Sequence, residues 1–272
     1  MSNTLSFASE LAAPKNHHTS QAVWCFRTDP YVYYRTYVQE KLESPPVIRN
    51  TTEMLYKYEL LLGSEKFDEK FDTRSPINPS TKKHYGEETQ KFAEWSKIVR
   101  SEGKIPIHPS DAEAAHYAYL QTVEQINDGF AFTLKGLLME GGQSGIQATA
   151  LIDNSHCYAH VDHLSRDGAV GLVRMVHSLD KIKGSDLYAE LAFTSAFWYT
   201  TLAESTVRYG LNSRAYVIIA EYNAPFRVSV NEINVPLWCS EVHNAIYKLN
   251  QSFNGTVYSS WKSPYHEPAK LV

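Results

Sequence analysis

The feature that most constrains the fold is a change of pattern part-way along the chain. From Tyr37 to Gly141, apolar side chains recur at helical spacing, and proline-containing breaks separate one run from the next. Ser110 followed by Asp111 indicates the start of one of these helices. The sequence on either side has strand character instead. This order predicts a mixed α+β protein interrupted by a helix-rich insertion of about 100 residues.

Outside the insertion, several short segments have the β-branched and aromatic composition that is typical of strands. They are residues 21–27, 146–152, 187–194, 216–222 and 226–230. Two further segments have other patterns. Residues 161–172 contain two glycines and predict a helix or a turn, and residues 195–207 predict a helix that ends near Gly210.

These patterns divide the chain into three parts. We expect residues 1–20 to be a flexible, polar leader, residues 21–36 and 142–272 to form the core, and residues 37–141 to form the helical insertion. The insertion is the candidate region for target recognition, because the core has no evident use for it. The alternative is that it packs against the core as structural padding.

Composition argues against several classes of protein. Lys and Arg number 26 against 30 Asp and Glu, and the net charge of −4 argues against nucleic-acid binding through bulk phosphate neutralisation. The 3 cysteines are too few for a disulfide framework and favour a reducing compartment. No apolar run approaches the roughly 20 residues of a membrane span. We expect no standard signal peptide, and the polar leader would suit a bacterial protein injected into another cell.

Three polar side chains are candidates for catalysis. Arg27 follows a predicted strand, where a guanidinium suits a pyrophosphate or ribose, unless it forms a surface ion pair with Asp29. Ser195 lies where a predicted strand turns into a helix, and its hydroxyl would either orient a carboxylate or cap the helix. Glu241 would stabilise positive charge on a reacting sugar, or else be an acidic residue at the N-terminus of a helix.

Histidines near residue 160 offer two further readings. His163, beside Asp162, would bind a ribose hydroxyl or a backbone carbonyl near a cofactor, or else be a structural group. His156 and His160 would share one face of a helix, so that a zinc-dependent hydrolase using His156, His160 and His163 is a competing hypothesis. The His-Glu-x-x-His arrangement is absent, and no third-ligand motif is evident elsewhere.

In chain order, these segments resemble the catalytic subunits of the pertussis and cholera toxins, which are mono-ADP-ribosyltransferases with an Arg…Ser-Thr-Ser…Glu order. Residues 24–29 (WCFRTD) resemble the opening aromatic-Arg-x-Asp strand, and residues 162–165 (DHLS) resemble the Asp-His-Leu-Thr turn. Residues 193–195 (FTS) match the last two positions of Ser-Thr-Ser, and residues 240–241 (SE) resemble the Ser-Glu pair. Residues 216–228 resemble the strand that leads toward the glutamate. The resemblance covers less than half of the chain.

This resemblance implies a β-sandwich-like, NAD-binding ADP-ribosyltransferase core, in which the nicotinamide–ribose bond breaks with oxocarbenium character. It implies transfer of ADP-ribose to a host protein by a secreted or injected bacterial toxin or effector, acting in the host cytoplasm without a metal. The implied catalytic residues are Arg27, Ser195 and Glu241. The implied contacts to NAD are Arg27, Asp29, His163, Thr194 and Ser195.

Three positions depart from, or leave open, the pattern of that family. Phe193 replaces the first serine of Ser-Thr-Ser, and the interval between Arg27 and His163 is far longer than in those toxins. Cys239 stands where arginine-directed members carry a second glutamate, so the acceptor side chain stays open. A second alternative is therefore a binding module that kept the fold, lost catalysis and uses the helical insertion as its working surface.

Overall fold

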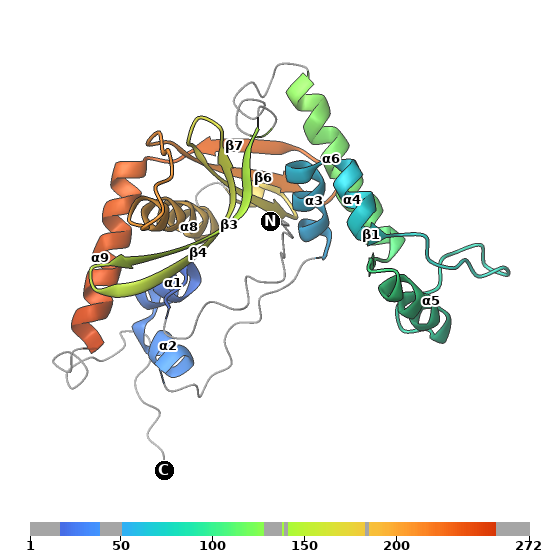
Figure 1. Ribbon diagram of the computed structural model, residues 1–272, viewed down its shortest axis with the longest axis horizontal. Helices are drawn as coiled ribbons and strands as arrows, with labels where there is room; N and C mark the ends of the chain where they lie inside the picture. Colours follow the sequence, from blue (N-terminus) through green and yellow to red (C-terminus); the bar gives the residue numbers. More distant parts are fainter. Residues whose placement is uncertain (1–16, 39–50, 128–137, 139–140, 183–184, 254–272) are drawn as a thin grey trace, which may run out of the picture.

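The computed structural model describes residues 17–38, 51–127, 138, 141–182 and 185–253 of the chain (Figure 1). A five-stranded mixed sheet carries helices on both faces, so the predicted α+β class is confirmed. Residues 1–16 of the predicted leader lie outside the described residues. No helix in the described part is both long and apolar enough to cross a bilayer.

The strands of the sheet follow the order β3–β4–β5–β6–β7. They are Gly142–Ile152 (β3), Ser155–Ser165 (β4), Val170–Val176 (β5), Ala215–Glu221 (β6) and Val228–Glu232 (β7). Neighbours are antiparallel except β5 and β6, which run parallel and are joined through α8 (Asp186–Ala203). Parallel neighbours require such a crossover connection. The predicted strands at 146–152, 216–222 and 226–230 are confirmed, with shifted ends.

One face of the sheet is covered by α8, by α1 (Ser20–Thr28) and by α9 (Val235–Phe253) (Figure 1). Phe193 and Phe197 of α8 are fully buried, and they pack in one core with Leu172 of β5 and Val217 of β6. Val242 of α9 belongs to the same core. Helix α8 is therefore enclosed between the sheet and the outer helices.

This enclosed helix corrects two predictions. Residues 187–194 were predicted as a strand and residues 195–207 as a separate helix, but α8 runs without a break through both. A helix that is buried on most sides lacks a polar stripe, and its apolar run then resembles a buried strand. Ser195 therefore lies in the middle of a helix rather than at its start.

Helix α1 occupies residues 21–27, which were predicted as a strand. The side chain of Thr19 accepts a hydrogen bond from the N–H of Ala22 at 3.3 Å and caps the helix. Ala22 and Phe26, four residues apart, are buried on one side. The prediction was wrong because a short apolar run does not distinguish a strand from a helix. Arg27 lies in the last turn.

Two helices of the predicted insertion, α3 (Thr51–Leu62) and α6 (Pro109–Asn127), lie on the opposite face of the sheet (Figure 1). Leu55 and Tyr56 of α3 pack in a second core with Val173 of β5 and Ile218 of β6. Helix α3 is thus part of the packing of the sheet. The predicted helix start at Ser110 is confirmed, since α6 begins one residue earlier with Asp111 in its first turn.

The remaining helices of the predicted insertion extend away from the sheet (Figure 1). We call residues 64–108 the arm. Its elements are α4 (Ser64–Lys70), β1 (Phe71–Asp72), α5 (Gln90–Ser101) and β2 (Ile105–Pro106). Strands β1 and β2 pair in parallel and hold the two ends of the arm together.

Residues 161–172, predicted as a helix or turn, form the end of β4, a turn and the start of β5. Gly168 in this turn has a φ of +93°, and a Cβ atom there would clash with the carbonyl oxygen of Gly210. The turn therefore requires glycine for two reasons. The prediction missed the hairpin because His163 to Ser165 are buried in a strand that shows no alternation of polar and apolar residues.

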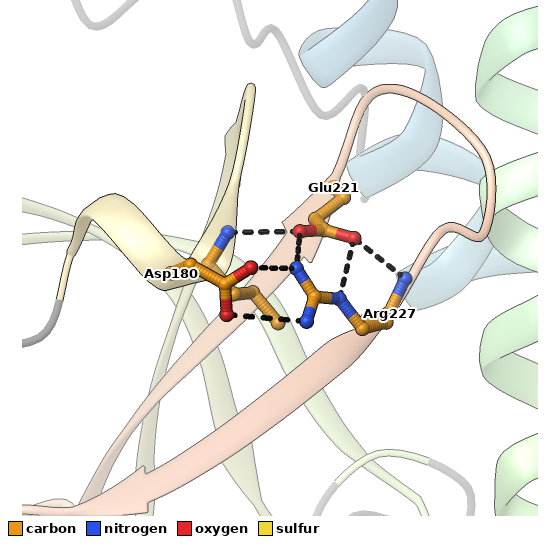
Figure 2. Close-up of polar contacts among 4 residues, drawn as sticks. Asp180, Glu221 and Arg227 are labelled. Carbon is orange, nitrogen blue, oxygen red and sulfur yellow. Dashed lines mark hydrogen bonds and ion pairs between the residues drawn. The ribbon is translucent and has the colours of Figure 1, made fainter.

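An ion-pair network fixes the β6–β7 hairpin to the short 3₁₀ helix η3 (Leu179–Lys181) (Figure 2). Arg227 Nη2 lies 2.6 Å from Glu221 Oε1 and 2.9 Å from Asp180 Oδ2. The N–H of Leu179 donates to Glu221 Oε1 at 2.9 Å. Hydrogen bonds from Arg227 lower the pKa of Glu221, although burial opposes the shift. The network has all of its charges paired and acts as a structural clamp.

Two short helical pieces follow α1. They are α2 (Pro30–Tyr33) and a π-helical turn, η2 (Tyr34–Val38). Before α1, His18 forms a parallel bridge with Cys157 of β4. The start of the described chain is thereby attached to the first residues of β4.

Candidate functional site

Of the residues predicted to be catalytic, Arg27 and Glu241 come together in the structure. Arg27 Nη2 donates to Glu241 Oε2 at 3.1 Å, between the end of α1 and the second turn of α9. The side chains are 34% and 38% exposed, so the pair lies at the surface. This pairing was not expected from the sequence, where Asp29 was the alternative partner of Arg27.

Aromatic rings lie beneath this ion pair. The guanidinium carbon of Arg27 lies 5.0 Å from the ring centre of Trp24 and 6.0 Å from that of Phe193. A surface hollow of about 460 Å³ adjoins the pair, and its lining includes Arg27, Glu241 and Tyr247. Ligand sites in proteins have volumes in this range. The hollow therefore has the size and the mixed polarity of a small-molecule site.

The serine motif does not reach this hollow. Ser195 is fully buried in α8, and its Oγ has no hydrogen-bond partner among the described residues. Within the described residues, the Ser195 hydroxyl therefore neither orients the carboxylate of Glu241 nor caps a helix. Thr194 is also buried, with 7% of its surface exposed. Neither hydroxyl is presented to a ligand.

The other predicted NAD contacts already have partners within the protein. Asp29 caps α2, where its Oδ1 accepts hydrogen bonds from the N–H groups of Tyr31 at 3.1 Å and Val32 at 3.0 Å. His163 is buried within β4, and its Nδ1 lies 2.7 Å from Ser144 Oγ on β3. The contact of His163 matches the structural role that the sequence left as its alternative, whereas the capping of α2 by Asp29 was not suggested by the sequence.

The histidines of the competing metal hypothesis lie along a strand rather than a helix. His156, His160 and His163 all belong to β4. A strand rises about 3.3 Å per residue, so that His156 and His160 are separated by about 13 Å along it. Within the described ranges, no group of three or more His, Cys, Asp or Glu side chains is arranged to hold a metal ion. The expected sharing of a helical face does not occur.

The most densely charged buried site lies elsewhere, where β4 and β5 separate. Two residue pairs, 163 with 171 and 164 with 170, join these strands. Further along β5, the N–H of Val173 donates to Asp162 Oδ2 at 2.8 Å. The N–H of Met175 donates to Glu53 Oε2 at 2.9 Å. Two carboxylates thus accept the hydrogen bonds that a neighbouring strand accepts in a regular ladder.

Two cations bind these carboxylates. Lys57 Nζ donates to Asp162 Oδ1 at 3.1 Å and lies 3.4 Å from Glu53 Oε1. Arg174 Nη1 donates to Glu53 Oε1 at 2.8 Å. Glu53 and Lys57 are four residues apart on α3 and share the face that meets the sheet. We call Glu53, Lys57, Asp162 and Arg174 the central charge cluster.

The central charge cluster is buried and electrically balanced. The side chain of Asp162 is 0% exposed and that of Lys57 is 5% exposed, while Arg174 reaches the surface at 33%. Burial raises the pKa of Glu53, but Lys57, Arg174 and the N–H of Met175 outweigh this effect and lower it overall. Buried charges are costly unless each is paired and hydrogen-bonded, as these are.

A third carboxylate lies near the exposed end of the cluster. Burial raises the pKa of Glu190 on α8, and the positive charge of Arg174 opposes the shift. Glu190 is half-buried and lies close enough to Arg174 to feel its charge. Helices from both faces of the sheet therefore contribute charge to this edge.

Sequence reasoning missed the central charge cluster. In the motif of residues 162–165, the sequence draws attention to His163 and gives Asp162 no role of its own. Two signals were present: an aspartate between Val161 and Leu164, and Lys57 within an apolar helical run. Charged residues at core positions are rare unless paired, so each signal indicates a buried partner. The sequence does not show that Asp162 and Lys57 are partners of each other.

Comparison with known proteins gives a likeness in structure only. No model of a known family matches this chain, and no curated protein matches it. The crystal structure of a "putative exonuclease" from Eubacterium rectale matches with a TM-score of 0.53 at 9% identity, over 100% of this chain and 91% of that one. The likeness concerns the fold. The structure of SSO0001 matches more weakly, with a TM-score of 0.38 at 11% identity, over 92% of this chain and 83% of that one.

Proposed function

We propose that this chain is a non-catalytic binding protein whose partner is another protein. The observation that carries the proposal is the central charge cluster. Each carboxylate of the cluster accepts a strand N–H and pairs with a buried cation of the chain itself. Such groups stabilise the fold, and the ion pairs oppose their use as bases, nucleophiles or metal ligands.

The likeness in fold to the Eubacterium rectale protein also supports the proposal, when it is considered together with the central charge cluster. The Eubacterium rectale protein is described as a "putative exonuclease", and the likeness in fold covers 100% of this chain. Metal-dependent nucleases hold their cations with carboxylates at the site of cleavage. Here the buried carboxylates Asp162 and Glu53 pair with Lys57 and Arg174 instead. The balance of charge supports retention of a nuclease-like architecture without its chemistry, because fold alone does not fix function.

Exposed apolar side chains indicate where a partner would dock. Ile77 and Ile98 of the arm are 54% and 58% exposed, and Tyr117 and Leu120 of α6 are 56% and 44% exposed. Large apolar groups on a protruding element are typical of protein interaction sites. The net charge of −4 favours a protein over a nucleic acid as the partner.

The first test concerns catalysis. Purified protein is incubated with end-labelled single-stranded and double-stranded linear DNA, with Mg²⁺ or Mn²⁺ present. We expect no shortening of the DNA above that of an Asp162→Asn control. Degradation by the wild type that this substitution abolishes would overturn the proposal.

The second test concerns binding. Cross-linking mass spectrometry in a lysate of the source cells compares the wild type with Ile98→Lys and Tyr117→Lys. The matched control is Leu151→Lys, because Leu151 is 55% exposed on β3, away from the arm. We expect cross-links to one protein that are lost with the first two variants and kept with the control. Cross-links that survive all three substitutions would place the partner elsewhere.

A second candidate function is favoured by the contact between Arg27 and Glu241. ADP-ribosyl transfer from NAD to a protein side chain would use this pair, with Arg27 on a phosphate and Glu241 on the nicotinamide ribose. Its support is that the two residues meet beside a hollow of about 460 Å³ whose lining includes both of them. This NAD-binding core, the toxin or effector role, and action on a host protein remain proposals.

Mass spectrometry with NAD and a host-cell lysate tests this second candidate. Release of nicotinamide and a gain of ADP-ribose on a protein are expected for the wild type and for Glu204→Gln, which alters an exposed glutamate at the end of α8. Loss of roughly 10²–10³ in rate is expected for Glu241→Gln, since removal of one preorganised group has that effect. Equal signals from all three proteins, or none from the wild type, would remove this candidate.

A further inference from the structure

We propose that Lys57 is a built-in counter-cation, whose ammonium group occupies a position that a divalent metal ion takes when the lysine is removed. The central charge cluster would then be a latent site for a hard cation such as Mg²⁺ or Mn²⁺, blocked by the chain itself. This inference rests on the proposed absence of catalysis and gives it a cause.

The geometry of the carboxylates points to a single cation position. Asp162 approaches Lys57 Nζ from β4 with Oδ1 and Oδ2, both at 3.1 Å, and Glu53 approaches it from α3 at 3.4 Å. Oxygen atoms of two carboxylates from two different elements thus converge on one positive charge. Carboxylate oxygens are the ligands that Mg²⁺ and Mn²⁺ prefer.

The surroundings fix these carboxylates in place independently of the lysine. Val173 and Met175 donate their N–H groups to the second oxygens of Asp162 and Glu53, and Arg174 also holds Glu53. Among the described residues, removal of the Lys57 side chain would therefore leave two positioned carboxylates, a vacant volume and the guanidinium of Arg174. A buried carboxylate without its counter-charge is strongly unfavourable. The site would then gain a proton or recruit a cation.

The ammonium group of Lys57 differs from a metal ion in what it can do chemically. A tethered ammonium cannot dissociate and cannot bind a water molecule as a nucleophile, whereas a metal ion can do both. Lys57 thus supplies the positive charge without supplying a reactive ligand position. Substitution of one residue is expected to change which ion fills the site, and no rearrangement of the strands is required.

Metal binding to variants tests the inference. Mn²⁺ binding is measured by electron paramagnetic resonance, and thermal unfolding is measured with EDTA or with Mn²⁺ for the wild type, Lys57→Ala and Lys57→Met. The matched control is Lys66→Ala, because Lys66 forms an exposed ion pair with Glu69. We expect Mn²⁺ to raise the unfolding temperature of Lys57→Ala by several degrees, and to bind it at least tenfold more tightly than the wild type or the control.

The added substitution Asp162→Asn identifies the ligands. It should remove the Mn²⁺ response of Lys57→Ala, since it replaces one of the two carboxylates. If both Lys57 variants fold and neither binds Mn²⁺ more tightly than the wild type, the inference is wrong. Failure of both variants to fold even with Mn²⁺ present would also overturn it, because a metal ion should replace the lost charge.

The readouts separate this inference from the proposed function. A wild type that degrades DNA would remove the non-catalytic role, and that result comes from the cleavage assay. A Lys57→Ala protein without Mn²⁺ binding would remove the latent site and would leave the binding role standing. A wild type that binds Mn²⁺ as tightly as the variant would show that Lys57 does not block the site.

Discussion

Ser195 carries a hydroxyl group that is enclosed in α8 and makes no hydrogen bond to the described residues. A buried hydroxyl that loses its contacts with water and gains no partner destabilises the folded state. A catalytic role of Ser195 would make its substitution lower the activity. The observed burial without a partner instead predicts that the substitution does not lower the stability.

We expect Ser195→Ala to leave the free energy of unfolding unchanged or to raise it by about 1 kcal/mol. Urea denaturation followed by circular dichroism measures it. Ser155→Ala is the control, because Ser155 Oγ donates to Asn250 Oδ1 and its removal should cost about 1 kcal/mol or more. A loss of stability in Ser195→Ala equal to that of the control would show that the Ser195 hydroxyl has a partner.

Functional candidates could be predicted from the sequence only where the residues around them form a local motif. The sequence singled out Arg27 and Glu241, and the structure brings them within 3.1 Å of each other. It passed over Lys57 and Asp162, because their meaning depends on a contact between residues 105 positions apart. A single sequence shows that a charge interrupts an apolar run, but it does not show which other charge compensates it.

Among the elements, the β6–β7 hairpin has the clearest electrostatic support. Glu221 is buried at the end of β6, and Arg227 from the hairpin turn gives it hydrogen bonds (Figure 2). Because these bonds lower the pKa of Glu221 below its ordinary value of 4.5, the folded state favours the ionised carboxylate. The resulting stability is fully present above pH 4.5 and is lost as the pH falls through the lowered value.

We expect Arg227→Met to lower the free energy of unfolding at pH 7 by about 1–3 kcal/mol, since it leaves a buried carboxylate with fewer partners. The difference from the wild type should shrink as the pH is lowered below 4.5. Denaturation curves at pH 7, 5 and 3.5 measure the trend. A difference that stays constant over this range would mean that Glu221 does not depend on Arg227 for its ionisation.

Prediction of the elements succeeded where a pattern was local. The strands β3, β6 and β7 and the start of α6 show it, because their β-branched composition or their early acidic residues are sufficient evidence. Prediction failed for α8 because its enclosed surface has too few polar positions to reveal a helical period, and for α1 because its apolar run is too short to distinguish a helix from a strand. Burial, which sequence alone does not specify, decided these cases.

On the scale of the whole molecule, stability is distributed unevenly. Helix α8 lies within the main core, whereas the arm extends away from the sheet and has exposed apolar residues such as Ile77 and Ile98 (Figure 1). Regions with few buried contacts open with little free energy, and enclosed regions open only with global unfolding.

Hydrogen–deuterium exchange should therefore show the slowest exchange in α8 and β6 and much faster exchange in α5. The expected contrast is more than tenfold in rate, because local opening of the arm breaks few core contacts. Peptide-level mass spectrometry of the native protein provides the measurement. Equal protection of α5 and α8 would mean that the arm unfolds together with the core.

The position of α1 between α8 and α9 has a consequence for biosynthesis. Arg27 and its partner Glu241 are separated by 214 positions, so α1 cannot dock against α9 until the residues between them have been translated. Its apolar residues Val23 and Phe26 stay uncovered by α9 during that time. Late formation of such long-range contacts slows folding and prolongs the exposure of apolar surface that is prone to aggregation. Helix α1 is therefore translated long before its packing against α9 can be completed.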